Sequence, residues 1–128
     1  MKTNSRQELD VLSSRIIGSA FNVSNSLGCG FLEKVYENAM AVEFRSTGIQ
    51  YSQQASFLVR HREEVVGEYV PDLIVEDSIV VEIKALDCLS RIHQAQCMNY
   101  LRATGLRLAL LLNFGMPRVE IKRIVMNF

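Results

Sequence analysis

Apolar residues recur at steps of three and four along the start of the chain, which is the spacing of one helix face. A capping box formed by Ser5 and Glu8 precedes them, and the apolar stripe comprises Leu9, Leu12, Ile16, Ala20, Val23 and Leu27. We therefore expect a helix over about residues 6–27. Its stripe either packs in the core or forms the seam of a homodimer.

Gly28-Cys29-Gly30 interrupts this pattern. A second apolar stripe follows it, carried by Phe31, Val35, Ala39 and Val42. The spacing predicts a helix over about residues 31–47, and Gly48 is placed to end it.

The pattern changes to a period of two beyond residue 50, which is typical of β-strands. Alternating apolar residues lead into a polar turn at 62–64, and an apolar segment at 65–69 follows, so the sequence predicts a β-hairpin that begins near Tyr51. Residues 73–75 extend its second strand or begin another. Residues 79–85 predict the next strand, after a polar turn.

The last third of the chain predicts a helix and two strands. The helix begins at Asp87 or Ser90 and runs to about Thr104. Residues 108–113, LALLLN, form an unbroken apolar run that suits a central strand buried on both faces, and residues 119–126 predict a final strand. The order ααβββαββ contains an αβββαβ core, so we expect an α/β fold with a mixed sheet flanked by helices and an extra N-terminal helix.

Length and composition favour one domain over residues 1–128, because 128 residues with 48% hydrophobic content suffice for one core but not for two. No apolar run is long enough to span a bilayer, and the first ten residues are polar where a secretory signal would be apolar. A cytoplasmic protein without a membrane segment is therefore expected. The cysteines Cys29, Cys88 and Cys97 include no C-x-x-C pair and predict reduced thiols.

The charges balance, with 14 basic and 14 acidic residues, which argues against a protein that coats nucleic acid non-specifically. Several basic residues could still meet a nucleic-acid backbone, although solvated surface charges are the commoner case. They are Arg91, Arg102, Arg107 and the pair His61-Arg62 at the hairpin tip. A lone histidine, His93, is more simply a surface residue than a metal ligand.

The segment PDLIVEDSIVVEIKA, residues 71–85, places charged residues in strands that are otherwise apolar. Side chains two apart share one face of a strand, so Glu82 and Lys84 project side by side. Asp72 lies one strand and one turn earlier and joins them if the two strands are neighbours. Two converging carboxylates favour a bound cation, and oxygen ligands suit Mg²⁺. The alternative is a surface face that carries an ordinary Glu-Lys pair.

Two helical pairs add to this pattern. Gln96 and Tyr100 lie four residues apart, and Glu33 and Tyr36 lie three apart, so each pair shares one helix face. Tyr36 either packs in the core with its hydroxyl satisfied or contacts a substrate.

The segment GFLEKVY, residues 30–36, matches a Gly-x-x-Glu-x-x-Tyr signature, so the chain resembles the GxxExxY protein family. That family belongs to the PD-(D/E)XK nuclease superfamily, whose pattern is similar to Pro71-Asp72, Glu82-Ile83-Lys84 and Gln96 to Tyr100 in this chain. The resemblance extends over about residues 16–124 and implies a restriction-endonuclease-like fold.

The resemblance also implies roles for individual residues. Asp72 and Glu82 would bind a metal ion together with the backbone carbonyl of Ile83. Lys84 would hold the attacking water or stabilise charge on the scissile phosphate. Glu33 would be a further metal ligand or would hydrogen-bond a metal-bound water.

The remaining implied site residues are Gln96 and Tyr100, which would orient the lysine and water or contact the substrate backbone. The expected activity is hydrolysis of nucleic-acid phosphodiester bonds with Mg²⁺ or Mn²⁺, and the habits of the superfamily favour DNA over RNA. One alternative is a module that retains the fold and binds nucleic acid or protein without cutting. Another is a homodimeric regulatory unit that uses the first helix as its interface, and a nuclease could also act as a homodimer or with a partner subunit.

Overall fold

The computed structural model describes residues 5–126, so the first four and last two residues of the expected domain lie outside the described range. The elements in chain order are α1 (Arg6–Leu27), α2 (Glu33–Thr47), β1 (Tyr51–Gln53), β2 (Phe57–His61), β3 (Glu64–Tyr69), β4 (Leu73–Val75), β5 (Ile79–Lys84), α3 (Arg91–Thr104), β6 (Leu108–Asn113) and β7 (Glu120–Val125).

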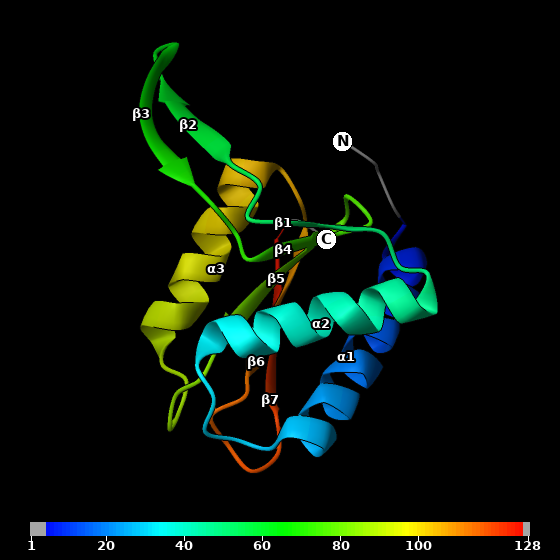
Figure 1. Ribbon diagram of the computed structural model, residues 1–128. Coiled ribbons are helices and arrows are strands. Elements are labelled where there is room, and N and C mark those ends of the chain that lie inside the picture. Colours follow the sequence, from blue (N-terminus) through cyan, green and yellow to red (C-terminus); the bar gives the residue numbers. More distant parts are fainter. Residues whose placement is uncertain (1–4, 127–128) are drawn as a thin grey trace.

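Five strands form one mixed sheet in the order β1-β4-β5-β6-β7, in which β5 and β6 are parallel and the other neighbours are antiparallel. Helices α1 and α2 cover one face and α3 covers the other (Figure 1). The expected α/β class and the restriction-endonuclease-like arrangement of a mixed sheet between helices are confirmed.

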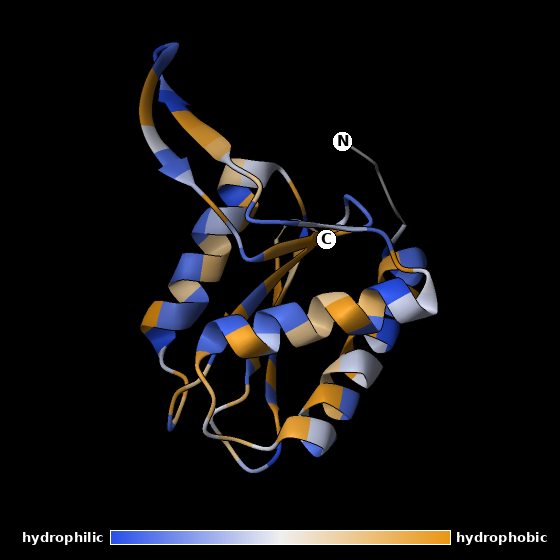
Figure 2. Ribbon diagram, in the orientation of Figure 1, coloured by the Kyte–Doolittle hydropathy of each residue, from blue (hydrophilic) through white to orange (hydrophobic). Residues whose placement is uncertain are grey.

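Strand β6 is the central apolar strand that the run LALLLN predicts, because all six of its residues are buried. Its alternate side chains enter the two separate cores, one beneath α1 and α2 and one beneath α3. Figure 2 shows hydrophobic residues concentrated in these central strands, whereas the helices alternate between hydrophobic and hydrophilic stripes.

Helix α1 has the predicted bounds, and Ser5 caps it by accepting a hydrogen bond from the Glu8 amide at 3.1 Å. Its apolar stripe, from Leu9 to Val23, is buried against the sheet and α2. Of the two alternatives that the sequence left open for this stripe, the structure shows core packing. Among residues 5–126, no helix combines the length and apolar character needed to cross a membrane.

The predicted hairpin differs from the structure. Its first strand is divided into β1, which joins the main sheet beside β4, and β2, which pairs with β3 in a separate two-stranded ribbon. The division falls at Gln54, whose left-handed backbone (φ 56°) turns the chain out of the sheet. Five strands rather than three therefore precede α3.

Candidate active site

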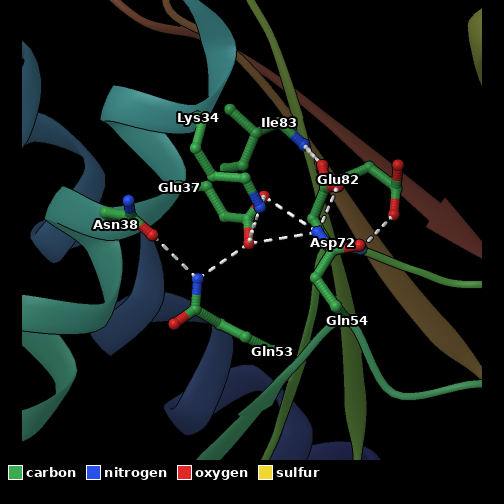
Figure 3. A network of polar contacts seen from close by, with 8 residues as sticks. All are labelled: Lys34, Glu37, Asn38, Gln53, Gln54, Asp72, Glu82 and Ile83. Atoms are coloured by element: carbon green, nitrogen blue, oxygen red, sulfur yellow. Dashed lines mark hydrogen bonds and ion pairs between the residues drawn. The ribbon is translucent and has the colours of Figure 1, made fainter.

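The antiparallel pairing of β4 with β5 ends at Leu73 opposite Val81. The same register would place Pro71 opposite Ile83, but proline has no N–H to contribute to a ladder. Beyond the last ladder pair, the side chain of Asp72 takes the place of a backbone acceptor, since its Oδ2 accepts a hydrogen bond from the Ile83 amide at 2.8 Å. In return, the Asp72 amide donates to Glu82 Oε1 at 2.7 Å (Figure 3). The two carboxylates are thus fixed beside each other by the backbone.

Strand alternation places both carboxylates on the face of the sheet that α3 covers. Ile74 and Val80, two residues from Asp72 and Glu82, pack in the core beneath α3, whereas Val81 and Ile83 pack beneath α1 and α2. The expectation that Glu82 and Lys84 share one face therefore agrees with the packing of their neighbours. The neighbouring-strand arrangement that brings Asp72 alongside is also present.

Both carboxyl groups resist ionisation. Burial, followed by the negative charge of Asp72, raises the pKa of Glu82 to about 8. Burial likewise raises the pKa of Asp72, although its hydrogen bond from Ile83 opposes the shift. A cation between the two groups would favour their ionised forms. The chemistry of the pair therefore suits a cation.

Lys84 lies two residues beyond Glu82 on β5 and is half-buried. Its positive charge opposes the rise in the pKa of both Asp72 and Glu82 without cancelling it, which is the effect of a cation close to the pair. The backbone at this point is fixed, because the carbonyl of Lys84 accepts a hydrogen bond from the Phe114 amide at 2.8 Å.

Helix α3 presents Tyr100 to the carboxylates. Burial, and then the charges of Glu82 and Asp72, raises the pKa of the Tyr100 hydroxyl to about 12. Cys97, one turn earlier, is buried, and burial followed by the charge of Glu82 raises the pKa of its thiol to about 12. The predicted partner Gln96 is exposed, so the structure brings Tyr100 to the site but leaves the Gln96 side chain at the surface.

Helix α2 contributes an acidic residue that the sequence analysis missed. Glu37 is 3% exposed, and its charge raises the pKa of both Asp72 and Glu82. The predicted residue Glu33 lies one turn earlier and is exposed, and no hydrogen bond or ion pair of its side chain is present within residues 5–126. Both glutamates follow from the same helix spacing, but only the packing of α2 on the sheet shows which one reaches the site.

Two consecutive glutamines hold the Glu37 carboxylate (Figure 3). Gln53 Nε2 donates to it at 2.7 Å, and Gln54 Nε2 donates at 3.0 and 3.1 Å. The same Gln54 amide also approaches Asp72 Oδ1 at 3.4 Å, so it links the two acids. Lys34 pairs with Glu37 at 3.1 Å from the solvent side. The left-handed backbone of Gln54, which divides the predicted strand, thus also directs its side chain toward Glu37 and Asp72.

Tyr36 positions the start of α2. Its hydroxyl donates to the Gly28 carbonyl at 2.6 Å and accepts from the Phe31 amide at 3.2 Å, while its ring stacks on Phe114 with centroids 4.7 Å apart. Tyr36 is fully buried, so the question left by the sequence is resolved in favour of a core residue with a satisfied hydroxyl.

We expect Tyr36→Phe to lower the free energy of unfolding by about 1–3 kcal/mol, because the Gly28 carbonyl and the Phe31 amide lose their partner. Urea denaturation measures the change. Tyr51→Phe is the matched control, since the Tyr51 hydroxyl only accepts from Arg45 at the exposed surface. Equal effects of the two substitutions would contradict the role assigned to Tyr36.

The chain beyond Lys84 is clamped by β6. Asn113, fully buried, accepts from the Leu86 amide at 2.9 Å and donates to the Leu86 carbonyl at 3.0 Å. Gly115 follows it closely, because a Cβ added there would lie 2.2 Å from the Leu86 carbonyl oxygen. The segment Asn113 to Gly115 therefore fixes the end of the strand that carries Glu82 and Lys84.

Gly115→Ala should therefore destabilise the protein by at least about 2 kcal/mol, because the backbone of residues 85–86 must move to admit a methyl group. Thermal denaturation compared with Gly67→Ala tests this, since a Cβ at Gly67 meets no atom within 4 Å. A Gly115→Ala protein as stable as Gly67→Ala would show that the close approach is not a constraint.

The donor set at this site suits a hard divalent cation. Asp72 and Glu82 each use one oxygen for a backbone amide, and the second oxygen of each, Oδ1 and Oε2, is left for a ligand apart from the 3.4 Å approach of Gln54. Carboxylate oxygens with open positions for water are the ligands that Mg²⁺ and Mn²⁺ prefer. Within residues 5–126, no three His, Cys, Asp or Glu side chains cluster closely enough to form a metal site from side chains alone.

Residues 10–124 match the family model of the PD-(D/E)XK nuclease superfamily, and the chain belongs to that superfamily. The fold is similar to the crystal structure of SSO0001, with a TM-score of 0.60 and 18% identity over 74% of this chain and 50% of that chain. The chain thus spans about half the length of that structure.

An alkaline exonuclease from Laribacter hongkongensis, LHK-Exo, is also similar, with a TM-score of 0.46 and 13% identity over 98% of this chain and 73% of that chain. No protein with curated annotation matches the sequence. The family-model match over residues 10–124 confirms the superfamily implied by the sequence motifs.

Proposed function

We propose that this nuclease-superfamily chain is a member of the GxxExxY family and a Mg²⁺- or Mn²⁺-dependent enzyme that hydrolyses phosphodiester bonds, with DNA as its substrate. The observation that carries the proposal is the reciprocal backbone bonding of Asp72 and Glu82, which holds two carboxylates of raised pKa beside Lys84. Ionising two neighbouring carboxyl groups in a buried site costs free energy unless a cation is bound. Strongly shifted pKa values of this kind are common at functional sites.

Each residue of the site would have a separate role in hydrolysis. Asp72 and Glu82 would hold the metal with the Ile83 carbonyl, and the bound ion would polarise the phosphate and activate water. Lys84 would stabilise the negative charge that develops on the phosphate, as an ammonium fixed beside the site. Tyr100 would donate a hydrogen bond from a hydroxyl that stays protonated, because its pKa is raised to about 12.

Glu37 and Gln54 would support the two metal ligands, Asp72 and Glu82. Glu37 adds negative charge that favours a cation, and the Gln54 amide orients both Glu37 and Asp72. Glu33 remains a proposed contact to a metal-bound water at the exposed end of α2, and Gln96 a proposed contact to substrate backbone.

We expect Glu37→Gln to lower metal-dependent cleavage by about 10- to 100-fold, the usual effect of a group that supports a ligand. Glu33→Gln should change it by less than about threefold, because Glu33 is exposed and a glutamine amide can still hydrogen-bond a metal-bound water. Initial rates with a labelled oligonucleotide measure both. A larger loss of activity for Glu33→Gln than for Glu37→Gln would assign the role to Glu33, the residue favoured by the motif, and would contradict the role of Glu37.

A cleavage panel tests the proposed activity. Wild-type protein is incubated with single-stranded, duplex and branched DNA and RNA in Mg²⁺, Mn²⁺ or chelator, beside Lys84→Ala. The proposal expects metal-dependent cleavage of at least one DNA substrate that Lys84→Ala abolishes. Cleavage that survives this substitution undiminished, or that ignores chelator, would contradict it.

A second candidate function is a non-catalytic module that binds nucleic acid or protein through the same fold. The balanced charge of 14 basic and 14 acidic residues favours it, because many nucleases carry a basic surface. Binding without cleavage anywhere in the panel would support this candidate.

A further inference from the structure

We propose that the pocket between the β2–β3 ribbon and α3 binds one unpaired nucleotide of the substrate strand, adjacent to the scissile phosphate. The inference rests on the proposed function and names a substrate-binding subsite for it. The pocket has a volume of about 330 Å³ and is lined by Leu58, Val59, Arg60, Tyr69, Asn99, Arg102 and Ala103. This volume lies in the range of small-molecule sites.

A contact between two aromatic rings links the pocket lining to the active site. Tyr69 on β3 contacts Tyr100 on α3 edge-on, with ring centroids 5.4 Å apart. Tyr100 in turn lies close enough to Glu82 and Asp72 for their charges to raise the pKa of its hydroxyl. A strand whose phosphate lies at these carboxylates can therefore place a neighbouring nucleotide over Tyr69.

The lining has the chemistry of a nucleotide site. It contains two arginines and no acidic residue. Arg102 Nη1 donates to Asn99 Oδ1 at 2.8 Å, which orients one side of the guanidinium and leaves its other N–H groups for a phosphate. Tyr69 is 38% exposed, so part of its ring is available to a base. Arginines and an exposed aromatic ring are the elements that recognise single strands.

The shape of the ribbon supports this position. Figure 1 shows β2 and β3 projecting from the main sheet beside α3. The pairing register shifts between Val59 and Arg60, which marks a β-bulge, and bulges re-aim side chains near functional sites. A two-stranded ribbon is marginally stable by itself, so its packing on α3 holds the pocket together. Leu58 remains 48% exposed on this ribbon.

Fluorescence anisotropy tests the subsite independently of catalysis. A short fluorescein-labelled DNA single strand, and the same strand in a duplex, are titrated with wild type and variants in chelator. Arg60→Ala and Arg102→Ala should each weaken single-strand binding about fivefold and reduce the slope of log K against log salt by about 0.7. Tyr69→Ala should weaken it about tenfold and leave that slope unchanged.

Three controls accompany these variants. Tyr69→Phe keeps the ring and should bind as wild type. Lys122→Ala removes an exposed positive charge on the far edge strand β7 and should have no effect on single-strand binding. Duplex binding should not respond to Tyr69→Ala, because a paired base would first have to leave its stack.

The outcomes separate the subsite from the catalytic proposal. If wild type binds and cleaves but the double variant Arg60→Ala/Arg102→Ala and Tyr69→Ala bind single strands as wild type does, the subsite is wrong and the nuclease proposal stands. If the variants lose binding while wild type never cleaves, the pocket stands as a single-strand binding site and the nuclease proposal fails. Absence of any oligonucleotide binding by the wild type would overturn the subsite.

Discussion

Asp72→Asn and Glu82→Gln should each lower metal-dependent cleavage by about a thousandfold or more, which corresponds to about 4 kcal/mol of lost transition-state stabilisation. Each substitution removes one of the two carboxylates that would hold the metal. The amide replacements keep an oxygen that can accept the backbone hydrogen bonds of the reciprocal Asp72–Glu82 arrangement. Loss of activity would thus reflect lost charge rather than lost fold.

Single-turnover rates under saturating metal measure the effect. Asp77→Asn is the matched control, because it makes the same chemical change in the exposed turn at the other end of β4 and β5, where asparagine tolerates the left-handed backbone (φ 51°). Rates for Asp72→Asn within about tenfold of the Asp77→Asn rate would exclude Asp72 from the site.

The second large effect is on stability and is expected from the buried acid pair. In chelator at about pH 9, Glu82→Gln should be more stable than wild type by about 2–4 kcal/mol. The folded pKa of Glu82, about 8, is raised above its ordinary value of 4.5. The folded state therefore keeps a proton that the unfolded chain has released, and this contribution to stability is full below about pH 4.5.

That contribution is lost as the pH rises through about 8, so wild type should lose stability between about pH 5 and 9, and the raised pKa of Asp72 acts in the same direction. Glu82→Gln has no proton to lose at this position and should decline much less. Urea denaturation at the two pH values gives the comparison. Parallel decline of both proteins would contradict burial of an ionisable pair. Mn²⁺ at about pH 9 should restore wild type and leave Glu82→Gln unchanged.

The sequence predicted the features that depend on local periodicity. The three-to-four spacing and the cap at Ser5 located α1, Gly48 located the end of α2, and the unbroken apolar run located β6. The stripe predicted for α2 was wrong, because Phe31, Val35 and Val42 are exposed and the helix buries Tyr36, Met40 and Phe44 instead. The period of two in β5 placed Glu82 and Lys84 on one face, because side-chain direction in a strand follows directly from the backbone.

Features that depend on long-range packing could not be predicted in the same way. The division of the first hairpin strand depends on the backbone of Gln54, a residue type with no strong preference for left-handed conformation. Whether Glu37 or Glu33 lies at the site depends on how far each helical turn of α2 is from the sheet, and the sequence does not give that distance. The partners of Glu37 are Gln53, the last residue of β1, and Gln54, which follows it, and both lie beside α2 only in the folded chain.

Titration of Mn²⁺ into wild type and Asp72→Asn by calorimetry, at pH 7 in two buffers of different ionisation enthalpy, tests the central claim most directly. Because Glu82 has a pKa of about 8, wild type should bind Mn²⁺ and release close to one proton per ion. Asp72→Asn should remain folded and bind at least about a hundredfold more weakly. Binding of equal strength in both proteins, or no binding by wild type even with oligonucleotide present, would show that the paired carboxylates do not form a metal site.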